Sequence, residues 1–160
     1  MFESLDVFGA AVGSSDFAKA LKFSLYGYSL TNTAHVFGIA MLVGAILPLD
    51  LRLLGFFRSV DRGQAARLLV PFALSGLIIA VIAGAALFTV RAPDYVESSM
   101  LGYKLILVSV GVFAALILHV RAGWWLDGAE DRYVALHGGV SLLCWLGALV
   151  FGRMIAYFPG

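Results

Sequence analysis

Mainly apolar stretches without Asp, Glu, Lys or Arg recur four times along the chain, and charged residues separate them. They cover residues 23–49, 68–90, 105–120 and 134–152. A helix of about 20 mainly apolar residues crosses a hydrocarbon core of about 30 Å, and the usable range reaches down to about 17 residues. The pattern therefore predicts four transmembrane helices, over about 23–54, 68–90, 103–125 and 134–157.

The third stretch reaches a spanning length only together with its flanks. Lys104 and Arg121 border it, and both have long side chains that can extend to the membrane surface. Tyr103 and the pair Trp124–Trp125 lie just outside these charges. Aromatic side chains of this kind are enriched at membrane–water interfaces, so we interpret them as the ends of the span.

Residues 1–22 have a different pattern. Leu5, Phe8, Phe17 and Leu21 alternate with charged residues, which is typical of a short amphipathic helix lying at the membrane interface. Ser14-Ser15-Asp16 is a plausible helix start within this segment. The segment lacks a basic start and a cleavage site, so it does not resemble a signal peptide. A loosely ordered tail is the alternative.

Composition agrees with a membrane protein. The chain is 61% hydrophobic and 13% charged, against about 45–50% and 25% in soluble globular chains. A net charge of +1 argues against a nucleic-acid partner, and the single Cys144 excludes an internal disulfide or a multi-cysteine metal cluster. We expect an all-α integral membrane four-helix bundle over 23–160, preceded by the interfacial segment 1–22, with the lipid bilayer as its surroundings.

Four spans place both termini on one side of the membrane, here named side A, and the connections after the first and third spans on side B. Side B carries six Lys and Arg residues and side A carries five. The excess favours side B as cytoplasmic under the positive-inside rule. We therefore expect a multi-pass membrane protein with both termini outside the cytoplasm. The resemblance to bacterial membrane proteins given below implies the inner membrane, with periplasmic termini.

All three histidines fall within or at the edge of predicted spans. His119 and His137 each lie within about one helical turn of side B, on consecutive helices joined by a short connection. Their rings can therefore approach one another. Paired imidazoles in a bundle core are one way to bind metal or b-type haem. The alternative is that the two histidines form hydrogen bonds between helices.

His35 lies about 20 Å from side B, because 14 residues lie between it and Asp50. It would need a ligand partner of its own, and Met154, Tyr157 or Arg153 is available from the end of the fourth span. Gly38, one turn after His35, would make room for a flat ring or for helix packing. Arg153 and Arg121 are the candidates to bind haem propionates.

Other polar and small residues have simpler interpretations. Asp50 and Arg52 are expected in a charge cluster at the end of the first span, with Arg121 or Arg67 as partners of Asp50. Small residues at Ser75–Gly76, Ala80 and Gly84 form a ridge that lets helix backbones approach. No hydrolase, P-loop or dinucleotide motif occurs, so the sequence leaves open whether the protein is an enzyme.

Three segments resemble a family of small bacterial four-helix membrane proteins, catalogued as a domain of unknown function. They are TNTAHVFGIAMLVGAILPLDLRLLGFF, YKLILVSVGVFAALILH and LGALVFGRMIAYF, and the resemblance extends from about Tyr26 to Phe158. The positions that match the pattern are His35, Asp50, Arg52, Lys104, His119 and Arg153; His137 does not carry over. The chain is distantly similar to copper-resistance protein D and to small b-type cytochrome bundles, whose membrane histidines bind metal or haem.

We therefore expect a haem b electron-transfer protein or cytochrome-like subunit with His119 and His137 as ligands. Its partner would be quinone or a periplasmic redox protein. One alternative is a non-catalytic structural or assembly subunit of a membrane complex. Another is a copper-handling protein that uses His35 with Met41 or Met154, although Cu(I) prefers a methionine cluster that the chain lacks. A chain of this size is a candidate for homo-oligomerisation.

Overall fold

The computed structural model describes residues 2–126, 128 and 130–157. These residues form seven helices and no strand, which confirms the predicted all-α class. Four helices are long and apolar enough to cross a membrane. They are α3 (Gly27–Leu53), α4 (Arg62–Val90), α6 (Ser99–Ala122) and α7 (Asp131–Met154). The three short helices are α1 (Phe2–Gly13), α2 (Asp16–Phe23) and α5 (Ala92–Val96).

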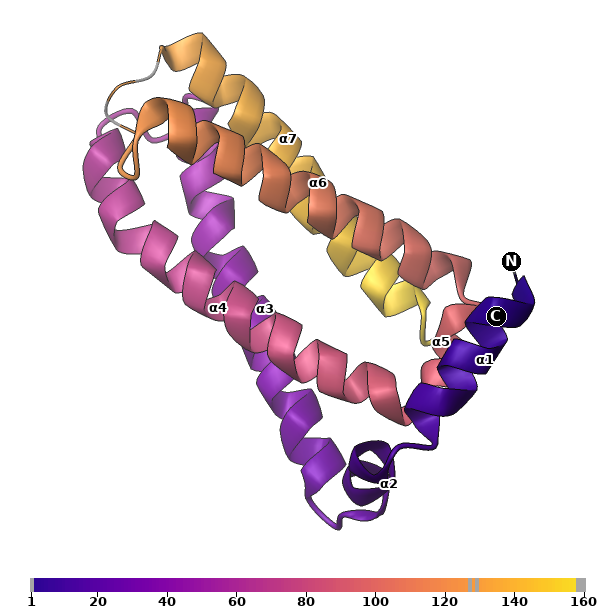
Figure 1. The fold of residues 1–160 in the computed structure, drawn as a ribbon. Coiled ribbons are helices and arrows are strands. Elements are labelled where there is room, and N and C mark those ends of the chain that lie inside the picture. The colour runs from indigo at the N-terminus through magenta and orange to yellow at the C-terminus, as the bar shows by residue number, and fades with distance from the viewer. Residues whose placement is uncertain (1, 127, 129, 158–160) are drawn as a thin grey trace.

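The four long helices form two pairs, α3 with α4 and α6 with α7, which meet through α3 and α7 (Figure 1). A cluster of buried apolar side chains joins the pairs near side B. Its members are Leu49, Leu53, Ala65, Ala66, Val70, Leu118, Ala122, Leu126 and Val134. Apolar contact near side B therefore holds the bundle together.

Glycines set the distance between α3 and α4. A Cβ atom added at Gly38 would lie 2.6 Å from the backbone N of Ala80, and one added at Gly76 would lie 2.5 Å from the backbone N of Leu42. Such distances leave no space for a side chain, so the two backbones are in direct contact. The ridge of small residues predicted on the second span is the surface that packs on α3, and Gly38 is a packing residue.

The helices do not begin and end at the residues predicted for the spans, and two of the differences have a clear local cause. α4 begins at Arg62, because the Asp61 side chain accepts a hydrogen bond from Gln64 N at 2.8 Å and caps the helix. α6 ends at Ala122, because Gly123 has a φ of +78°, which a right-handed helix cannot include. Trp124 and Trp125 therefore follow the helix instead of ending it. Of the predicted transmembrane domain, residues 158–160 lie outside the described part of the chain.

The N-terminal segment forms two helices with a break between them. The side chain of Ser15 accepts a hydrogen bond from Ala18 N at 3.2 Å, so the predicted helix start at Ser14-Ser15-Asp16 is the cap of α2. α1 packs on α5, with Gly9 against Val96 and the backbone of Ala92. The short helix α5 lies in the side A connection between α4 and α6 and was not predicted.

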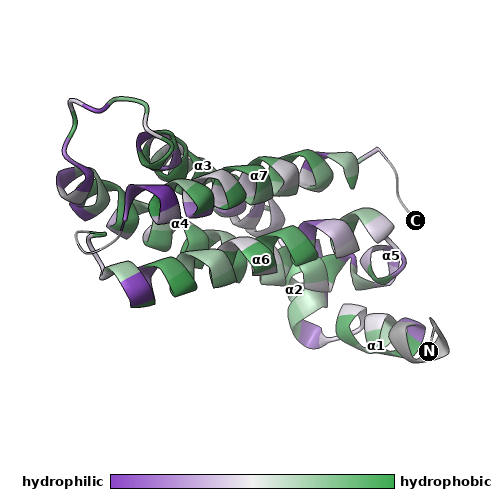
Figure 2. Cartoon of the chain, turned by 90° about the horizontal axis from the view of Figure 1, so that it is seen from above, coloured by the Kyte–Doolittle hydropathy of each residue, from purple (hydrophilic) through white to green (hydrophobic). Residues whose placement is uncertain are grey.

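Large apolar side chains cover the outside of the long helices. Exposed fractions reach 66% at Ile82, 73% at Leu143 and 84% at Val120. Figure 2 shows hydrophobic residues along most of the length of these helices, with hydrophilic residues mainly in loops and near helix ends. Such an exterior requires an apolar solvent, so this is a multi-pass membrane protein surrounded by lipid.

Candidate functional site

The packing of α6 against α7 places His119 and His137 at the same level. Gly111 faces Cys144 and Trp145, since a Cβ atom added at Gly111 would lie 3.3 Å from Cys144 Cβ. His119 lies eight residues after Gly111, and His137 lies seven residues before Cys144. Because the helices are antiparallel, these steps of eight and seven residues lead to about the same level, near side B.

The two imidazoles have different immediate neighbours. His137 Nδ1 lies 3.0 Å from the Tyr133 carbonyl oxygen, and the two rings are 4.3 Å apart between centroids. A carbonyl can only accept a hydrogen bond, so Nδ1 carries the proton and the neutral ring keeps a lone pair on Nε2. The His119 ring stacks on Trp124 at 5.6 Å. Its buried Nδ1 makes no hydrogen bond among the described residues, and the backbone of Gly123 and Trp124 lies close enough to interact with the ring.

Asp50 is a buried carboxyl group at the contact of α3 with α7, and it is only 4% exposed. The Ser141 side chain of α7 lies close enough to interact with this carboxyl group. The backbone oxygen of Asp50 would be 3.2 Å from a Cβ atom added at Gly138. The partner is therefore a hydroxyl group of α7, and the expectation of an interfacial ion pair with Arg121 or Arg67 was wrong. Ser141 gave no signal in the sequence, because nothing local relates it to Asp50.

His35 connects α3 to α4. Its Nδ1 donates a hydrogen bond of 2.8 Å to the carbonyl oxygen of Ala80. The ring lies against Gly84, where a Cβ atom would be 2.8 Å from His35 Cε1. Lys104 of α6 is close enough to interact electrostatically with this ring. Gly84 thus provides the space for the imidazole, which is the role that the sequence suggested for Gly38.

The arginines proposed as propionate partners lie at opposite ends of the molecule. Arg153 is exposed, and it donates a 3.0 Å hydrogen bond to the Tyr157 hydroxyl and lies over its ring. Two of the residues suggested as partners for His35 are therefore bound to each other. Arg121 is exposed near side B, in the last turn of α6 and two residues after His119.

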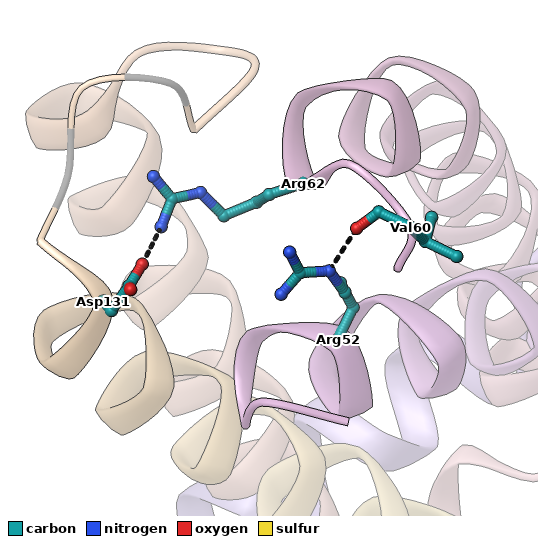
Figure 3. A network of polar contacts seen from close by, with 4 residues as sticks. All are labelled: Arg52, Val60, Arg62 and Asp131. Atoms are coloured by element: carbon teal, nitrogen blue, oxygen red, sulfur yellow. Dashed lines mark hydrogen bonds and ion pairs between the residues drawn. The ribbon is translucent and has the colours of Figure 1, made fainter. Parts of the chain in front are cut away.

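Side B also has a polar surface cavity of about 290 Å³ lined by Arg52, Asp61, Arg62, Gly63 and Asp131. Arg62 forms an ion pair of 3.0 Å with Asp131 at the start of α7, and Arg52 donates a hydrogen bond to the Val60 carbonyl (Figure 3). The first contact joins α4 to α7, and the second joins α3 to the loop that follows it.

On side A, Arg91 and Asp94 form a 2.9 Å ion pair beside a cavity of about 430 Å³. The hydrogen bond with Asp94 raises the pKa of Arg91, so the guanidinium stays charged. Burial raises the pKa of Tyr95, whose ring packs on Phe88 at 6.1 Å. This group stabilises the connection between α4 and α6.

Among the described residues, no group of three or more His, Cys, Asp or Glu side chains is arranged to hold a metal ion. Two imidazoles at one level suit haem better than a bare ion, since the porphyrin supplies four of the six iron ligands and zinc or copper needs three or four from the protein. Comparison with protein-family models, curated proteins and solved structures gives no match to this chain.

Proposed function

We propose that this protein binds one haem b near side B, with His119 and His137 as axial ligands, and transfers electrons within the membrane. The observation that carries the proposal is the common level of the two imidazoles on α6 and α7. His119 Nδ1 is buried without a hydrogen-bond partner in the described part of the chain. His137 keeps a lone pair on Nε2. Each ring therefore has a nitrogen for an iron ligand.

The surroundings suit such a site. The hydrogen bond from His137 to the Tyr133 carbonyl fixes its ring and tautomer, as second-shell partners do for ligating histidines. Leu118, Ala122 and Val134 are buried beside the two histidines and would exclude water. Haem would supply reversible one-electron transfer between its ferric and ferrous forms. Arg121, at the end of α6, would bind a propionate.

The electron partner in this proposal is a quinone, which reaches the site from the bilayer, or a redox subunit of the same membrane. A bacterial inner membrane with periplasmic termini is the location that the sequence favours. Copper is the weaker candidate for the bound group, because Nδ1 of His35 is already hydrogen-bonded to the Ala80 carbonyl oxygen. A copper ion would also need donors beyond the pair on α6 and α7.

A second candidate is a non-catalytic subunit of a membrane complex. It is favoured by the hydrogen bond between His35 and the Ala80 carbonyl, in which a membrane histidine connects two helices without a cofactor. If His119 and His137 act in the same manner, the protein needs no haem. The two candidates make opposite predictions for the visible spectrum of the purified protein.

The experiment is a reduced-minus-oxidised visible spectrum of protein purified in mild detergent from haem-replete cells, with a pyridine haemochrome assay for stoichiometry. We expect about one haem per chain, and its loss in His119→Ala and in His137→Ala. His35→Ala is the matched control and should retain haem. A colourless wild-type protein would refute the proposal and favour the structural role. Full haem in both α6 and α7 variants would show that the ligands are assigned wrongly.

A further inference from the structure

The surface cavity of about 430 Å³ on side A lies where the ends of several helices meet. There α2 contacts both α3 and α4, and α5 contacts α4 (Figure 1). The residues that line the cavity are Lys22 of α2, Tyr28 of α3, Val90 and Arg91 at the end of α4, and Pro93 and Asp94 of α5. Segments that are far apart in the chain therefore build one site.

The cavity lies at the level of lipid headgroups. α3 has 27 residues and α4 has 29, so at a rise of about 1.5 Å per residue these helices are about 40 and 43 Å long. The hydrocarbon core is about 30 Å thick, and a bilayer with its headgroup layers measures about 40–45 Å. Tyr28 at the start of α3 and Arg91 at the end of α4 therefore lie in the headgroup layer of side A.

Exposed apolar side chains follow Lys22 in the chain. Phe23 is 80% exposed, Leu25 is 82% exposed and Tyr26 is 68% exposed. Large apolar and aromatic side chains on the surface at the end of a span are typical of contact with the membrane interface. A molecule bound beside Lys22 can therefore keep an apolar part in the bilayer, as a phospholipid does and a free anion does not.

The polar groups of the lining are mainly hydrogen-bond donors. Arg91 Nε donates to Asp94 at 2.9 Å, and Arg91 Cζ lies 5.7 Å from the centre of the Tyr95 ring. These contacts orient the guanidinium and leave the N–H groups of its Nη atoms for another acceptor. Lys22 forms no ion pair with a described residue. Phosphate oxygens accept hydrogen bonds from both kinds of cation.

The balance of charge favours an anionic ligand. The ion pair with Arg91 balances the charge of Asp94, so Lys22 leaves one positive charge in excess. The cavity on side B differs, because its two arginines face two aspartates and leave no excess. Basic pockets at the ends of transmembrane helices are suited to the headgroups of anionic lipids.

We propose that the side A cavity binds the headgroup of one anionic phospholipid, with the phosphate between Lys22 and Arg91. Tyr28 has a hydroxyl group that can donate to the same phosphate, and a headgroup hydroxyl such as that of phosphatidylglycerol can donate to Asp94. The acyl chains then lie along the apolar exterior of the bundle. Such a lipid joins α2 to the end of α4, and its binding does not depend on haem.

Native mass spectrometry of the protein in a mild detergent, with phosphatidylglycerol added stepwise, tests the proposal. We expect one molecule of phosphatidylglycerol to bind more tightly than phosphatidylcholine with the same acyl chains. Lys22→Gln should weaken this binding about fivefold, as expected for the loss of one basic residue beside an anionic headgroup. Lys22→Arg should retain it. Lys19→Gln is the matched control, since Lys19 is exposed on α2 outside the lining, and it should leave the affinity unchanged.

Three results would overturn the proposal. One is equal affinity for phosphatidylglycerol and phosphatidylcholine. Another is equal affinity of the Lys22→Gln and Lys19→Gln variants for phosphatidylglycerol. Inorganic phosphate distinguishes a lipid from a free anion, and we expect millimolar phosphate to leave phosphatidylglycerol bound. Displacement of the lipid by phosphate, with a phosphate adduct that Lys22→Gln loses, would assign the cavity to a free anion instead.

Discussion

The contact of α3 with α4 allows a quantitative test of the glycine packing by the substitution Gly76→Ala. The new Cβ would lie 2.5 Å from Leu42 N, 2.7 Å from the Gly38 carbonyl oxygen and 2.9 Å from Met41 Cβ. These distances are about 1 Å short of favourable contact. Two of the three atoms belong to the backbone, so no side-chain rotation relieves the overlap and α3 must move away.

The change in the free energy of unfolding combines two costs and one gain. Overpacking of a close contact costs about 1–3 kcal/mol. Moving α3 away also weakens the hydrogen bond of 2.8 Å between His35 and Ala80, one turn along, and such bonds in membranes are worth about 0.6 kcal/mol on average. Replacing glycine by alanine in a helix returns at most about 1 kcal/mol. We expect a net loss of about 1–2 kcal/mol in the free energy of unfolding.

Gly44→Ala is the matched control, because it makes the same substitution within α3 and its Cβ would meet nothing within 4 Å. It should leave stability unchanged or raise it by up to about 1 kcal/mol. The assay is reversible unfolding in mixed micelles of a mild detergent and dodecyl sulfate, followed by far-ultraviolet circular dichroism. Equal stability of the Gly76→Ala and Gly44→Ala variants would refute the direct backbone contact.

Three further predictions concern single groups. His35→Ala should lower the free energy of unfolding by about 0.5–2 kcal/mol, and His35→Gln should recover part of it by donating to the Ala80 carbonyl; equal losses in the same micelle assay would contradict the bond. Asp61→Ala should cost about 1 kcal/mol through the lost cap on Gln64, whereas Asp61→Asn should cost little; no difference between these variants would rule out the cap. Burial raises the pKa of Tyr95. The contribution of Tyr95 to the free energy of unfolding should therefore be complete below about pH 10 and fall as the pH rises through the raised pKa. Phenolate absorbance compared with Tyr95→Phe checks this, and titration like an exposed tyrosine would contradict it.

Much of the fold could be predicted because its causes are local. The lengths of the uncharged stretches gave four spans, the hydroxyl of Ser15 gave the start of α2, and the spacing of Gly76, Ala80 and Gly84 gave the packing surface of α4. The end of α6 was missed although Gly123 marks it. The adjacent tryptophans continue the apolar pattern, but a φ of +78° ends the helix regardless of hydropathy.

The candidate site was predictable in its residue types and only partly in its contacts. The sequence placed His119 and His137 at similar depth, because depth follows from helix rise and from nearby charges. It gave no means to find Ser141 beside Asp50. That contact depends on the rotation and the relative height of α3 and α7. Both are set by the packing of side chains between the two helices.

The sequence by itself determined that this chain lies in a membrane, that it crosses it with four helices, and which few polar residues those helices contain. These properties follow from transfer free energies and from helix length, which require no knowledge of neighbours. Only the tertiary structure decided that His35 binds the backbone of α4, and that Asp50 lies buried against α7. Hydrophobicity is nearly uniform around these helices, so it does not specify which faces of two neighbouring helices pack together. Close packing at small residues specifies those faces.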